Sequence, residues 1–426
     1  MVNGIDRRNF LIGTSAALGT LSLGAPAALG QAKLRVIVIG GGPGGATAAK
    51  YIARDSKGAL DVVLVEPARQ FTTCFHSNLY LGGFKSFESI THRYDKLAPY
   101  GVSLNHQMAH AIDRDKKTVR LADGTSLPYD RLVVAPGIDL KYDSVPGWGK
   151  EHEEKMPHAW KAGPQTRLLK AQLDAVPDGG LIVMIAPPNP FRCPPGPYER
   201  VSMMAHALKN TGRADCRIVI IDPKKKFSKQ GLFQEGWEQH YPGMVEWLDP
   251  SIHEGVKSVD PATNSVVTGF ETYSNCALVN VIPAQMAGKI ARDAGLADQS
   301  GFCPVKAESM QSEMDPNIYV IGDSSIADAM PKSGFAANSQ AKVAAMMIRG
   351  ELTGARTFPA RYANTCWSLI DTDNTVKVGA RYAVKDHKIA PLETFISQNG
   401  ESTDLRRQNQ EENLGWYTGI TADIFS

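Results

Sequence analysis

The stretch from Lys33 to Glu66 constrains this chain most, because it places a glycine-rich turn between two short apolar runs. The β-branched residues 36–39 predict a strand, the alanine-rich residues 46–53 predict a helix, and residues 62–65 predict a second strand. An order of strand, turn, helix and strand is typical of a βαβ unit in a parallel sheet. We therefore expect an α/β fold.

The turn in this unit has the spacing of a dinucleotide-binding loop. Gly40 permits a tight turn, Gly42 lets a pyrophosphate approach the backbone, and Gly45 lets the helix pack closely on the strand. Glu66 follows at the end of the second strand, about 20 residues on, where an acid accepts a hydrogen bond from a ribose hydroxyl. The alternative, a glycine-rich loop without a ligand, leaves Glu66 unexplained.

Residues 1–30 have the pattern of a bacterial twin-arginine export signal. Arg7 and Arg8 precede a mildly apolar run at residues 11–23, and small residues fill positions 25–30. The run is short and rich in glycine and alanine for a membrane span. We expect cleavage near Gly30 and a periplasmic location, with an uncleaved N-terminal anchor as the alternative.

Composition limits the possible classes of protein. A length of 426 residues predicts two to three domains of about 150 residues each. The formal net charge of +2 shows no footprint of a nucleic-acid partner, and no later apolar run is long enough to span a bilayer. The six cysteines include no Cys-x-x-Cys pair, and the ten histidines show no metal-ligand spacing. We expect neither a metal nor a haem of its own on this chain.

The first domain, which we interpret as FAD-binding, is expected in two parts, residues 31–150 and 286–350. In the first part, residues 119–121 and 127–129 predict a small β-meander, and residues 132–134 predict another buried strand.

In the second part, a buried strand from Ile318 ends at Asp323, which we interpret as a contact to the ribityl chain rather than a plain turn or N-cap residue. Ser333 and Gly334 then open a long helix through Ile348, whose N-terminal dipole can stabilise negative charge on a reduced flavin ring.

A second Rossmann-like domain is expected at residues 151–285. Residues 181–186 and 217–222 predict strands, and residues 200–210 predict a helix between them. This topology invites a second nucleotide site, and Asp222 stands where a ribose-binding acid would stand.

The turn that would bind the second pyrophosphate is rich in proline, however, over residues 187–197. Proline has no N–H to donate and fixes φ, so we predict that this domain lacks a nicotinamide site. The basic run 224–226 is predicted to be a solvated loop rather than a docking site.

Residues 351–426 are less periodic than the rest of the chain. They contain a β-like segment at residues 375–383, and we interpret them as an interface domain. The fold class that we predict is α/β, with two Rossmann-like domains of the FAD/NAD(P) type and a C-terminal α+β interface domain.

Two segments carry a family resemblance: CPPGPYER at Cys193–Arg200 and TTCFHSNLYLGG at residues 72–83. With the paired FAD motifs and the twin-arginine pattern, the whole chain resembles the flavoprotein subunit of flavocytochrome c–sulfide dehydrogenase. This family lies within the two-dinucleotide-binding flavoprotein disulfide reductases, and sulfide:quinone oxidoreductases are more distant relatives.

The resemblance implies a role for several residues. Cys74 matches the cysteine that carries FAD covalently through a thioether, and Cys193 and Cys366 match the pair that forms a redox-active disulfide beside the flavin. Glu199 and Trp416 match residues around that pocket. The partner in the family is a small c-type cytochrome subunit, which carries the haem c, receives the electrons and completes a heterodimer.

The residues alone leave alternatives for these cysteines. Cys193 and Cys366 are far apart in the sequence and could form a structural disulfide or stay unpaired, while Cys74 could be a buried or free thiol. Three further cysteines, Cys216, Cys276 and Cys303, are predicted to be structural.

With the resemblance, we predict a periplasmic, FAD-linked enzyme that oxidises sulfide to sulfur or polysulfide and passes the electrons to a cytochrome c. Hydrosulfide would attack the disulfide by thiol–disulfide exchange, and Glu199 would manage protons. The alternatives are a quinone-reducing sulfide oxidase, a nicotinamide-dependent reductase and a non-catalytic electron-transfer flavoprotein.

Overall fold

A parallel sheet of five strands organises the first part of the computed structural model, which describes residues 32–426. Its strand order is β20–β9–β1–β2–β5. The bounds are β1 (Arg35–Ile39), β2 (Asp61–Val65), β5 (Val102–Asn105), β9 (Arg131–Val134) and β20 (Ile318–Val320). The predicted strands at 36–39, 62–65 and 132–134 are confirmed. The predicted export signal lies outside the described residues.

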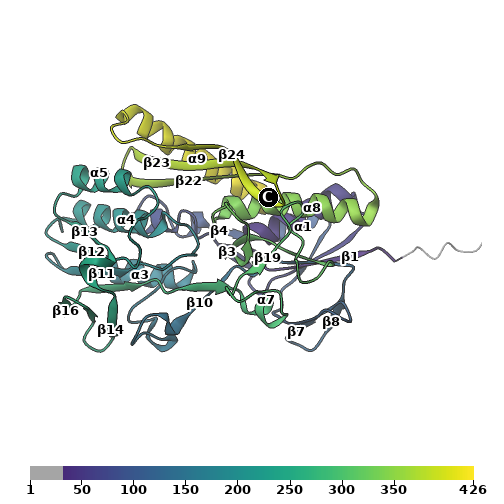
Figure 1. Cartoon of the computed structure of the whole chain (residues 1–426), viewed down its shortest axis with the longest axis horizontal. Helices are drawn as coiled ribbons and strands as arrows, with labels where there is room; N and C mark the ends of the chain where they lie inside the picture. The colour runs from purple at the N-terminus through teal and green to yellow at the C-terminus, as the bar shows by residue number, and fades with distance from the viewer. Residues whose placement is uncertain (1–31) are drawn as a thin grey trace, which may run out of the picture. The chain divides into compact units, whose positions relative to one another are not determined.

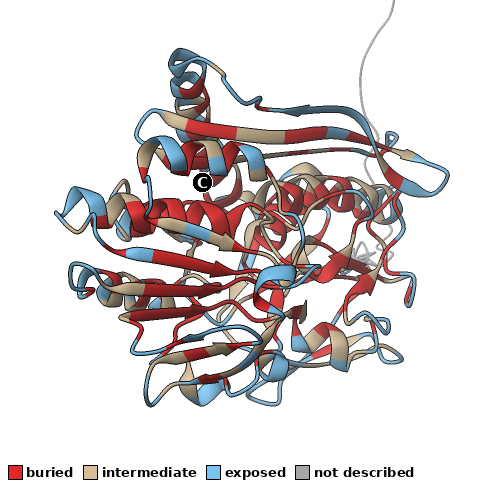
Figure 2. Ribbon diagram, turned by 60° about the vertical axis from the view of Figure 1, so that its left-hand side comes forward, coloured by how far each residue is buried: buried red, intermediate tan, exposed pale blue. Residues whose placement is uncertain are grey.

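Two helices pack together beside the glycine-rich turn that follows β1. Helix α1 (Pro43–Ser56) follows β1 directly, and α8 (Gly334–Thr353) packs along it. Helix α1 begins three residues before the predicted helix at 46–53, whereas α8 begins at Gly334 as predicted and ends five residues beyond Ile348. Because the helices and the other chain segments cover both faces of the sheet, the central strands β1 and β9 are apolar after their first residue rather than alternating. Figure 2 shows buried strands and helices in the interior of the fold and exposed residues mostly at its edges.

A second parallel sheet has the order β13–β12–β11–β17. Its strands are β11 (Leu181–Ile185), β12 (Arg217–Ile221), β13 (Val245–Leu248) and β17 (Leu278–Val281), and its helices are α3 (Pro164–Asp174), α4 (Gly196–Asn210) and α5 (Gln230–His240). The helix predicted at 200–210 begins four residues earlier, because Pro197 is tolerated in a first turn, where an N–H has no helical acceptor.

Smaller antiparallel pieces complete the two halves. The predicted meander is present, with strands β6 (Ala109–Asp113), β7 (Thr118–Leu121) and β8 (Ser126–Pro128). Two other small sheets are β14 (Val256–Asp260), β15 (Ser265–Thr268) and β16 (Thr272–Tyr273), and β10 (Ile138–Leu140) with β18 (Gln285–Ala287). The short elements are α2 (Ser77–Leu81), α6 (Pro250–His253), α7 (Lys289–Asp293), β3 (Gln70–Thr72), β4 (Thr91–Arg93), β19 (Cys303–Pro304) and β21 (Ser325–Ile326).

The C-terminal part is an antiparallel sheet and one long helix, which confirms the predicted α+β class. The sheet comprises β22 (Arg361–Asp371), β23 (Asn374–Lys385) and β24 (Lys388–Ile396), and the helix is α9 (Thr403–Phe425). Strand β22 packs on α4 and α5 of the second sheet and on α8 of the first, as Figure 1 shows. Each half of the fold therefore contacts the strand that carries Cys366.

The sequence did not predict α9, β22 or β24. Helix α9 buries polar side chains, among them Arg406, Asn409 and Asn413, so its apolar residues trace no clean stripe. Residues Leu34–Ser426 form one compact unit, and the boundaries of the expected domains remain a prediction. In the described part of the chain, no helix combines the length and the apolar character that a bilayer crossing requires.

We expect Gly45→Ala to lower the stability of the folded protein. A Cβ at this position would lie 1.8 Å from the carbonyl oxygen of Gly40, so α1 would have to move away from the turn. Overpacking of this kind costs about 1–3 kcal/mol. Thermal unfolding of the variant measures the loss. Gly415→Ala in α9 is the matched control, because its Cβ would meet no atom within 4 Å and should stabilise the helix by about 0.5–1 kcal/mol. Equal melting temperatures for the two variants would contradict the close packing.

Candidate active site

The carboxyl ends of β1, β9 and β20 border a groove that we call the dinucleotide groove. Of the residues predicted to bind the cofactor, Gly40, Gly42, Glu66, Cys74, Asp323, Ser333 and Gly334 line it. Gly45 lies beneath the turn instead, where it permits the close contact of α1 with Gly40. The sequence thus identified the residues that line the groove and also Gly45, which lies beneath it.

The backbone at the glycine turn leaves space that a side chain would fill. Gly40 has a φ of +97°, and a Cβ there would lie 2.3 Å from the carbonyl oxygen of Ala135. Glu66 accepts hydrogen bonds from the N–H groups of Gly41 and Ala68, at 2.8 and 2.9 Å. These bonds fix the carboxylate at the rim of the groove, and each oxygen keeps a second lone pair for a ligand.

Asp323 lies just beyond β20, as predicted, at the opposite wall of the groove. One of its oxygens lies 3.5 Å from the guanidinium of Arg192, and both side chains are largely buried. The other oxygen, Oδ1, is buried without a hydrogen-bond partner in the described residues. A buried acceptor of this kind requires a donor. A hydroxyl-rich chain such as the ribityl of FAD supplies one, so the residues of the groove fit FAD.

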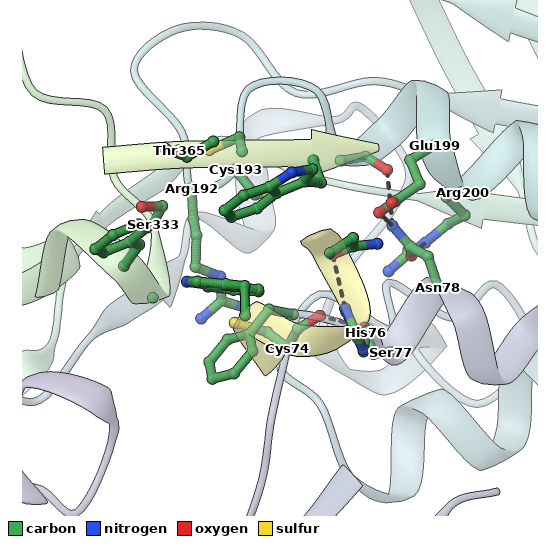
Figure 3. Close-up of a pocket in the computed structure, with 18 of the residues that line it drawn as sticks. Cys74, His76, Ser77, Asn78, Arg192, Cys193, Glu199, Arg200, Ser333 and Thr365 are labelled. Atoms are coloured by element: carbon green, nitrogen blue, oxygen red, sulfur yellow. Dashed lines mark hydrogen bonds between the residues drawn. The ribbon is translucent and has the colours of Figure 1, made fainter. Parts of the chain in front are cut away.

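A second cavity, which we call the inner cavity, continues from the groove. Four residues line both spaces: Cys74, Arg192, Ser333 and Gly334. Four predicted catalytic residues, Cys193, Cys366, Glu199 and Trp416, also line the inner cavity. Figure 3 shows Cys193 and Thr365 beside the strand that crosses one side of this cavity, with Cys74 on the other side. The structure therefore brings together residues from five separate stretches of the chain.

Cys193 is held by backbone contacts in the proline-rich turn before α4. Its φ is +58°, which is uncommon for a residue with a side chain, and its N–H donates to the carbonyl oxygen of Lys332 at 2.7 Å. A Cβ on Gly196 would lie 3.0 Å from Cys193 Sγ, so a larger residue there would press on the sulfur. These constraints aim the thiol into the inner cavity.

Cys366 enters the inner cavity from β22, where it pairs with Val378 of β23. All six cysteines are unpaired in the structure, so the predicted Cys193–Cys366 bridge is not formed there and stays a prediction. Burial raises the pKa of both thiols, because a thiolate loses hydration in the cavity. A thiolate in this cavity therefore needs compensating positive charge.

Glu199 lies in the first turn of α4 and is held at both oxygens. Asn78 Nδ2 donates to one at 2.9 Å, and the backbone N–H of Leu369 donates to the other at 3.1 Å. Burial raises the pKa of this carboxyl group, although both hydrogen bonds oppose the shift. The contact with Leu369 also joins β22 to α4, so Glu199 links the two segments that carry Cys366 and Cys193.

Lys229 is a charged residue of the site that sequence analysis missed. Its side chain is buried, and Nζ donates to the carbonyl oxygen of Cys366 at 3.1 Å and to Ser368 Oγ at 2.8 Å. No carboxylate of the described chain lies within 4.0 Å of this ammonium. Burial lowers the pKa of Lys229 to about 8. A single lysine before a helix carries no sequence signal, whereas Arg192 could have been suspected from its place beside Cys193.

Aromatic side chains close the inner cavity. Trp416 of α9 lies 5.6 Å from Phe75, 6.0 Å from Phe335 and 5.2 Å from Trp367, measured between ring centroids. Several polar atoms of the cavity are buried without a partner in the described residues: His76 Nδ1, Trp160 Nε1, Asn413 Nδ2 and Trp416 Nε1. These groups can bind polar atoms of a planar ligand between the rings.

In the second Rossmann-like sheet, protein side chains occupy the acid that would bind the ribose of a nucleotide. Asp222 is fully buried and accepts hydrogen bonds from Tyr198 at 2.6 Å and Trp247 at 2.9 Å, and Lys224 Nζ lies 2.6 Å away. The prediction that the run 224–226 is solvated is therefore wrong for Lys224, whose charge is paired inside. Asp222 has no free position for a ribose hydroxyl, in agreement with the proline-rich turn.

The remaining cysteines lie away from the two cavities. Cys216, Cys276 and Cys303 are all buried among apolar residues, as expected for structural thiols. Across residues 32–426, no cluster of three or more His, Cys, Asp and Glu side chains is arranged to hold a metal ion.

Comparison with known families places these features in context. Three family profiles match: "Sulfide dehydrogenase [flavocytochrome c] flavoprotein chain, central" at residues 166–283, "Flavocytochrome c sulphide dehydrogenase, flavin-binding" at residues 358–425, and "Pyridine nucleotide-disulphide oxidoreductase" at residues 34–172. The second profile covers the C-terminal sheet and α9, which contribute Cys366, Asn413 and Trp416 to the inner cavity.

Individual relatives agree with the profiles. The sulfide dehydrogenase [flavocytochrome c] flavoprotein chain of Chlorobaculum thiosulfatiphilum is 52% identical over 44 residues, which are 10% of this chain and 90% of that sequence. The mitochondrial sulfide:quinone oxidoreductase of Mus musculus is 23% identical over 309 residues. That match covers 68% of this chain and spans 65% of the mouse protein. The sulfide:quinone oxidoreductase structure from Aquifex aeolicus aligns with a TM-score of 0.68 at 17% identity, over 92% of both chains.

We expect Lys229→Gln to raise the pKa of the Cys366 thiol, because the variant keeps an N–H donor and removes the positive charge. A rise of one pKa unit slows alkylation of the reduced thiol about tenfold at a given pH below that pKa. The Lys229 ammonium loses its proton as the pH rises through about 8. The difference between the wild type and the variant is therefore largest below that pH and shrinks above it.

The measurement is the pH dependence of Cys366 alkylation in the reduced protein, followed by mass spectrometry. Lys229→Arg should behave as the wild type, because its charge remains. Lys377→Met on β23 is the control, since that ammonium pairs with Glu412. Identical pH profiles for the wild type and Lys229→Gln would show that the ammonium does not act on the thiol.

Proposed function

Because this chain belongs to the family of flavoprotein chains of flavocytochrome c sulfide dehydrogenase, we propose that it is an FAD-dependent sulfide dehydrogenase subunit. The observation that carries the proposal is the meeting of Cys193 and Cys366 in a cavity that is continuous with the dinucleotide groove. A disulfide between these two cysteines, beside a flavin, can accept two electrons from a sulfur nucleophile. The proposed substrate is sulfide, and the product is sulfur or polysulfide.

The first step is a thiol–disulfide exchange at a Cys193–Cys366 bridge. Hydrosulfide forms a bond to one cysteine sulfur, the bond between the two cysteines breaks, and a persulfide and a thiolate result. The sulfide sulfur is oxidised, and the displaced cysteine sulfur is reduced by the same electron pair. Lys229 lies where its charge stabilises the thiolate, and Glu199 lies where it can hold the proton that is released.

The residues of the groove would hold FAD. Gly42 and Glu66 would bind its nucleotide, Asp323 its ribityl chain, and the N-terminus of α8 at Ser333 would face its ring system. When bound, FAD supplies a two-electron acceptor that can release electrons one at a time. Cys74 lines both the groove and the inner cavity, which supports the proposal that it carries the cofactor as a thioether.

We assign the next acceptor to a separate c-type cytochrome subunit in a heterodimer, which would carry haem c. The assignment follows the name of the Chlorobaculum relative, and this chain lacks a Cys-x-x-Cys-His motif. The periplasmic location rests on the twin-arginine pattern of residues 1–30. A nicotinamide-dependent reductase is disfavoured because Asp222 and the proline turn leave no place for that nucleotide.

Anaerobic mixing of the purified holoprotein with sulfide, and separately with NADH, tests the proposal through the flavin absorbance. We expect bleaching by sulfide only, and reoxidation by an added c-type cytochrome. Reoxidation by a short-chain quinone alone would favour the quinone-reducing alternative, and bleaching by NADH alone would mean a nicotinamide reductase. No bleaching by either would leave an electron-transfer flavoprotein.

Cys193→Ser should abolish the bleaching by sulfide, because the exchange step requires both sulfurs. Reduction by dithionite should persist, since this reagent does not require the pair. Cys216→Ser is the matched control, because Cys216 is buried away from the inner cavity. Complete reduction of the flavin by sulfide in Cys193→Ser would rule out the disulfide mechanism.

Covalent attachment has a separate test. Acid precipitation of the wild-type holoprotein should leave the yellow colour in the pellet, whereas Cys74→Ser should release the flavin into the supernatant. The dithionite-reducible flavin spectrum before precipitation confirms that the variant binds its cofactor. Flavin that stays in the Cys74→Ser pellet would place the covalent bond on another residue. Flavin that is released from the wild-type pellet would exclude a covalent bond.

A further inference from the structure

Cys74 and Arg192 lie together where the dinucleotide groove joins the inner cavity. Both residues line both spaces, and so do Ser333 and Gly334 at the start of α8. Figure 3 shows the side chain of Arg192 extending toward Cys74 across the inner cavity. The thiol therefore shares this junction with a guanidinium and with the positive end of a helix dipole.

The backbone around Cys74 is held in place by protein contacts. Its carbonyl oxygen accepts hydrogen bonds from Ser77 Oγ at 2.6 Å and from the N–H of Ser77 at 3.2 Å. The next residue, Phe75, packs against Gly334, where an added Cβ would lie 2.6 Å from Cδ1 of the ring. A sulfur that must form one bond to one atom of a ligand requires a fixed starting position of this kind.

Arg192 is a buried cation whose charge is loosely paired. Its Nη2 donates to the carbonyl oxygen of Trp160, and its Nη1 lies 3.5 Å from Asp323 Oδ2, with each of these two charged side chains 12% exposed. A charge-assisted hydrogen bond is shorter, about 2.7–2.9 Å, so the guanidinium can still act on a second anion.

The titratable groups that face Cys74 come from three other parts of the fold. They are Arg192 and Cys193 in the turn before α4, Asp323 after β20 and Tyr417 of α9. Burial raises the pKa of the Cys74 thiol, Arg192 is the largest influence that lowers it, and Asp323 raises it again. Since the thiolate is the nucleophilic form of cysteine, the cation of this set controls how reactive the sulfur is.

We propose that Arg192 promotes the covalent attachment of FAD to Cys74 by stabilising the thiolate that attacks the cofactor. The inference rests on the thioether proposed for Cys74 and names a second residue that its formation requires. Arg192 acts through the sulfur and does not need to touch the reacting carbon.

The attachment step is balanced as follows. The S–H bond of Cys74 and one C–H bond of a methyl group on the flavin ring break, and an S–C bond forms between the two. Two protons and the electron pair pass to the ring system, so the cofactor is attached in its reduced form. A one-electron acceptor, such as the proposed cytochrome or added ferricyanide, then returns it to the oxidised form.

The rate of attachment tests the role of Arg192. The full chain is produced in riboflavin-starved cells and loaded with FAD in the presence of ferricyanide, and acid precipitation at intervals separates attached flavin from released flavin. At pH 7, we expect Arg192→Gln to attach flavin about tenfold more slowly than the wild type, because loss of the nearby charge raises the thiol pKa by about one unit. Its rate should then rise about tenfold per pH unit until the thiol is ionised.

Two further variants isolate the charge. Arg192→Lys keeps it and should attach flavin at a rate close to that of the wild type. Lys85→Gln is the matched control, because this ammonium lies 5.4 Å from the ring centroid of Tyr417 and lines neither the groove nor the inner cavity. Alkylation of Cys74 in the FAD-free chain gives a second pH profile, which needs no cofactor and serves for any variant that binds FAD poorly.

A slow rate in Arg192→Gln that recovers at high pH supports the inference. Equal rates in the wild type and Arg192→Gln at every pH overturn it, and so does a slow rate that high pH does not restore, because a purely structural defect is not relieved by ionising the thiol. A wild type that never retains flavin in its pellet overturns the thioether as well. Bleaching by sulfide is measured separately, so the proposed sulfide dehydrogenase activity does not fail with either.

Discussion

The backbone of β22 between Cys366 and Leu369 is the part of the structure on which the active site depends. Two buried side chains of the second Rossmann-like half hold it: Lys229 donates to the carbonyl oxygen of Cys366, and Glu199 accepts from the N–H of Leu369. On its other flank, β22 packs against α8 of the first half. A strand bound in this way cannot slide without leaving a charged group unsatisfied. The position of Cys366 relative to the flavin groove is therefore set by both halves at once.

Burial also explains why so many charges surround two thiols. Burial in this cavity opposes the ionisation of both thiols, because a thiolate there loses its hydration. Arg192, Arg200 and Lys229 bring positive charge to the walls, and Glu199 is the nearby carboxylate. Arg200 has no carboxylate partner and satisfies its guanidinium with Asn78, Asn280 and carbonyl oxygens instead. Its charge therefore remains available to anions that form in the cavity.

The sequence predicted what is encoded locally and missed what depends on distant contacts. The first βαβ unit follows from glycine spacing and apolar runs, so its strands, its helix and Asp323 could be placed within a few residues. Helix α9 could not, because it buries Asn409 and Asn413 and shows no apolar stripe. The meeting of Cys193 with Cys366 came only from the family resemblance, since no spacing rule links them. Lys229 left no signal, because its importance arises from its burial against β22.

The second Rossmann-like half shows how such a site can arise from a nucleotide-binding scaffold. The acid that ends β12 in a nucleotide site would bind a ribose, but here Asp222 binds Tyr198, Trp247 and Lys224 inside the protein. Tyr198 belongs to the same first turn of α4 as Glu199. The bond to Asp222 thus fixes the end of α4 that carries Glu199. The prolines before it remove the donors for a pyrophosphate and orient Cys193 instead. Asp222, which would bind a ribose in a nucleotide site, here holds the start of the helix that follows Cys193.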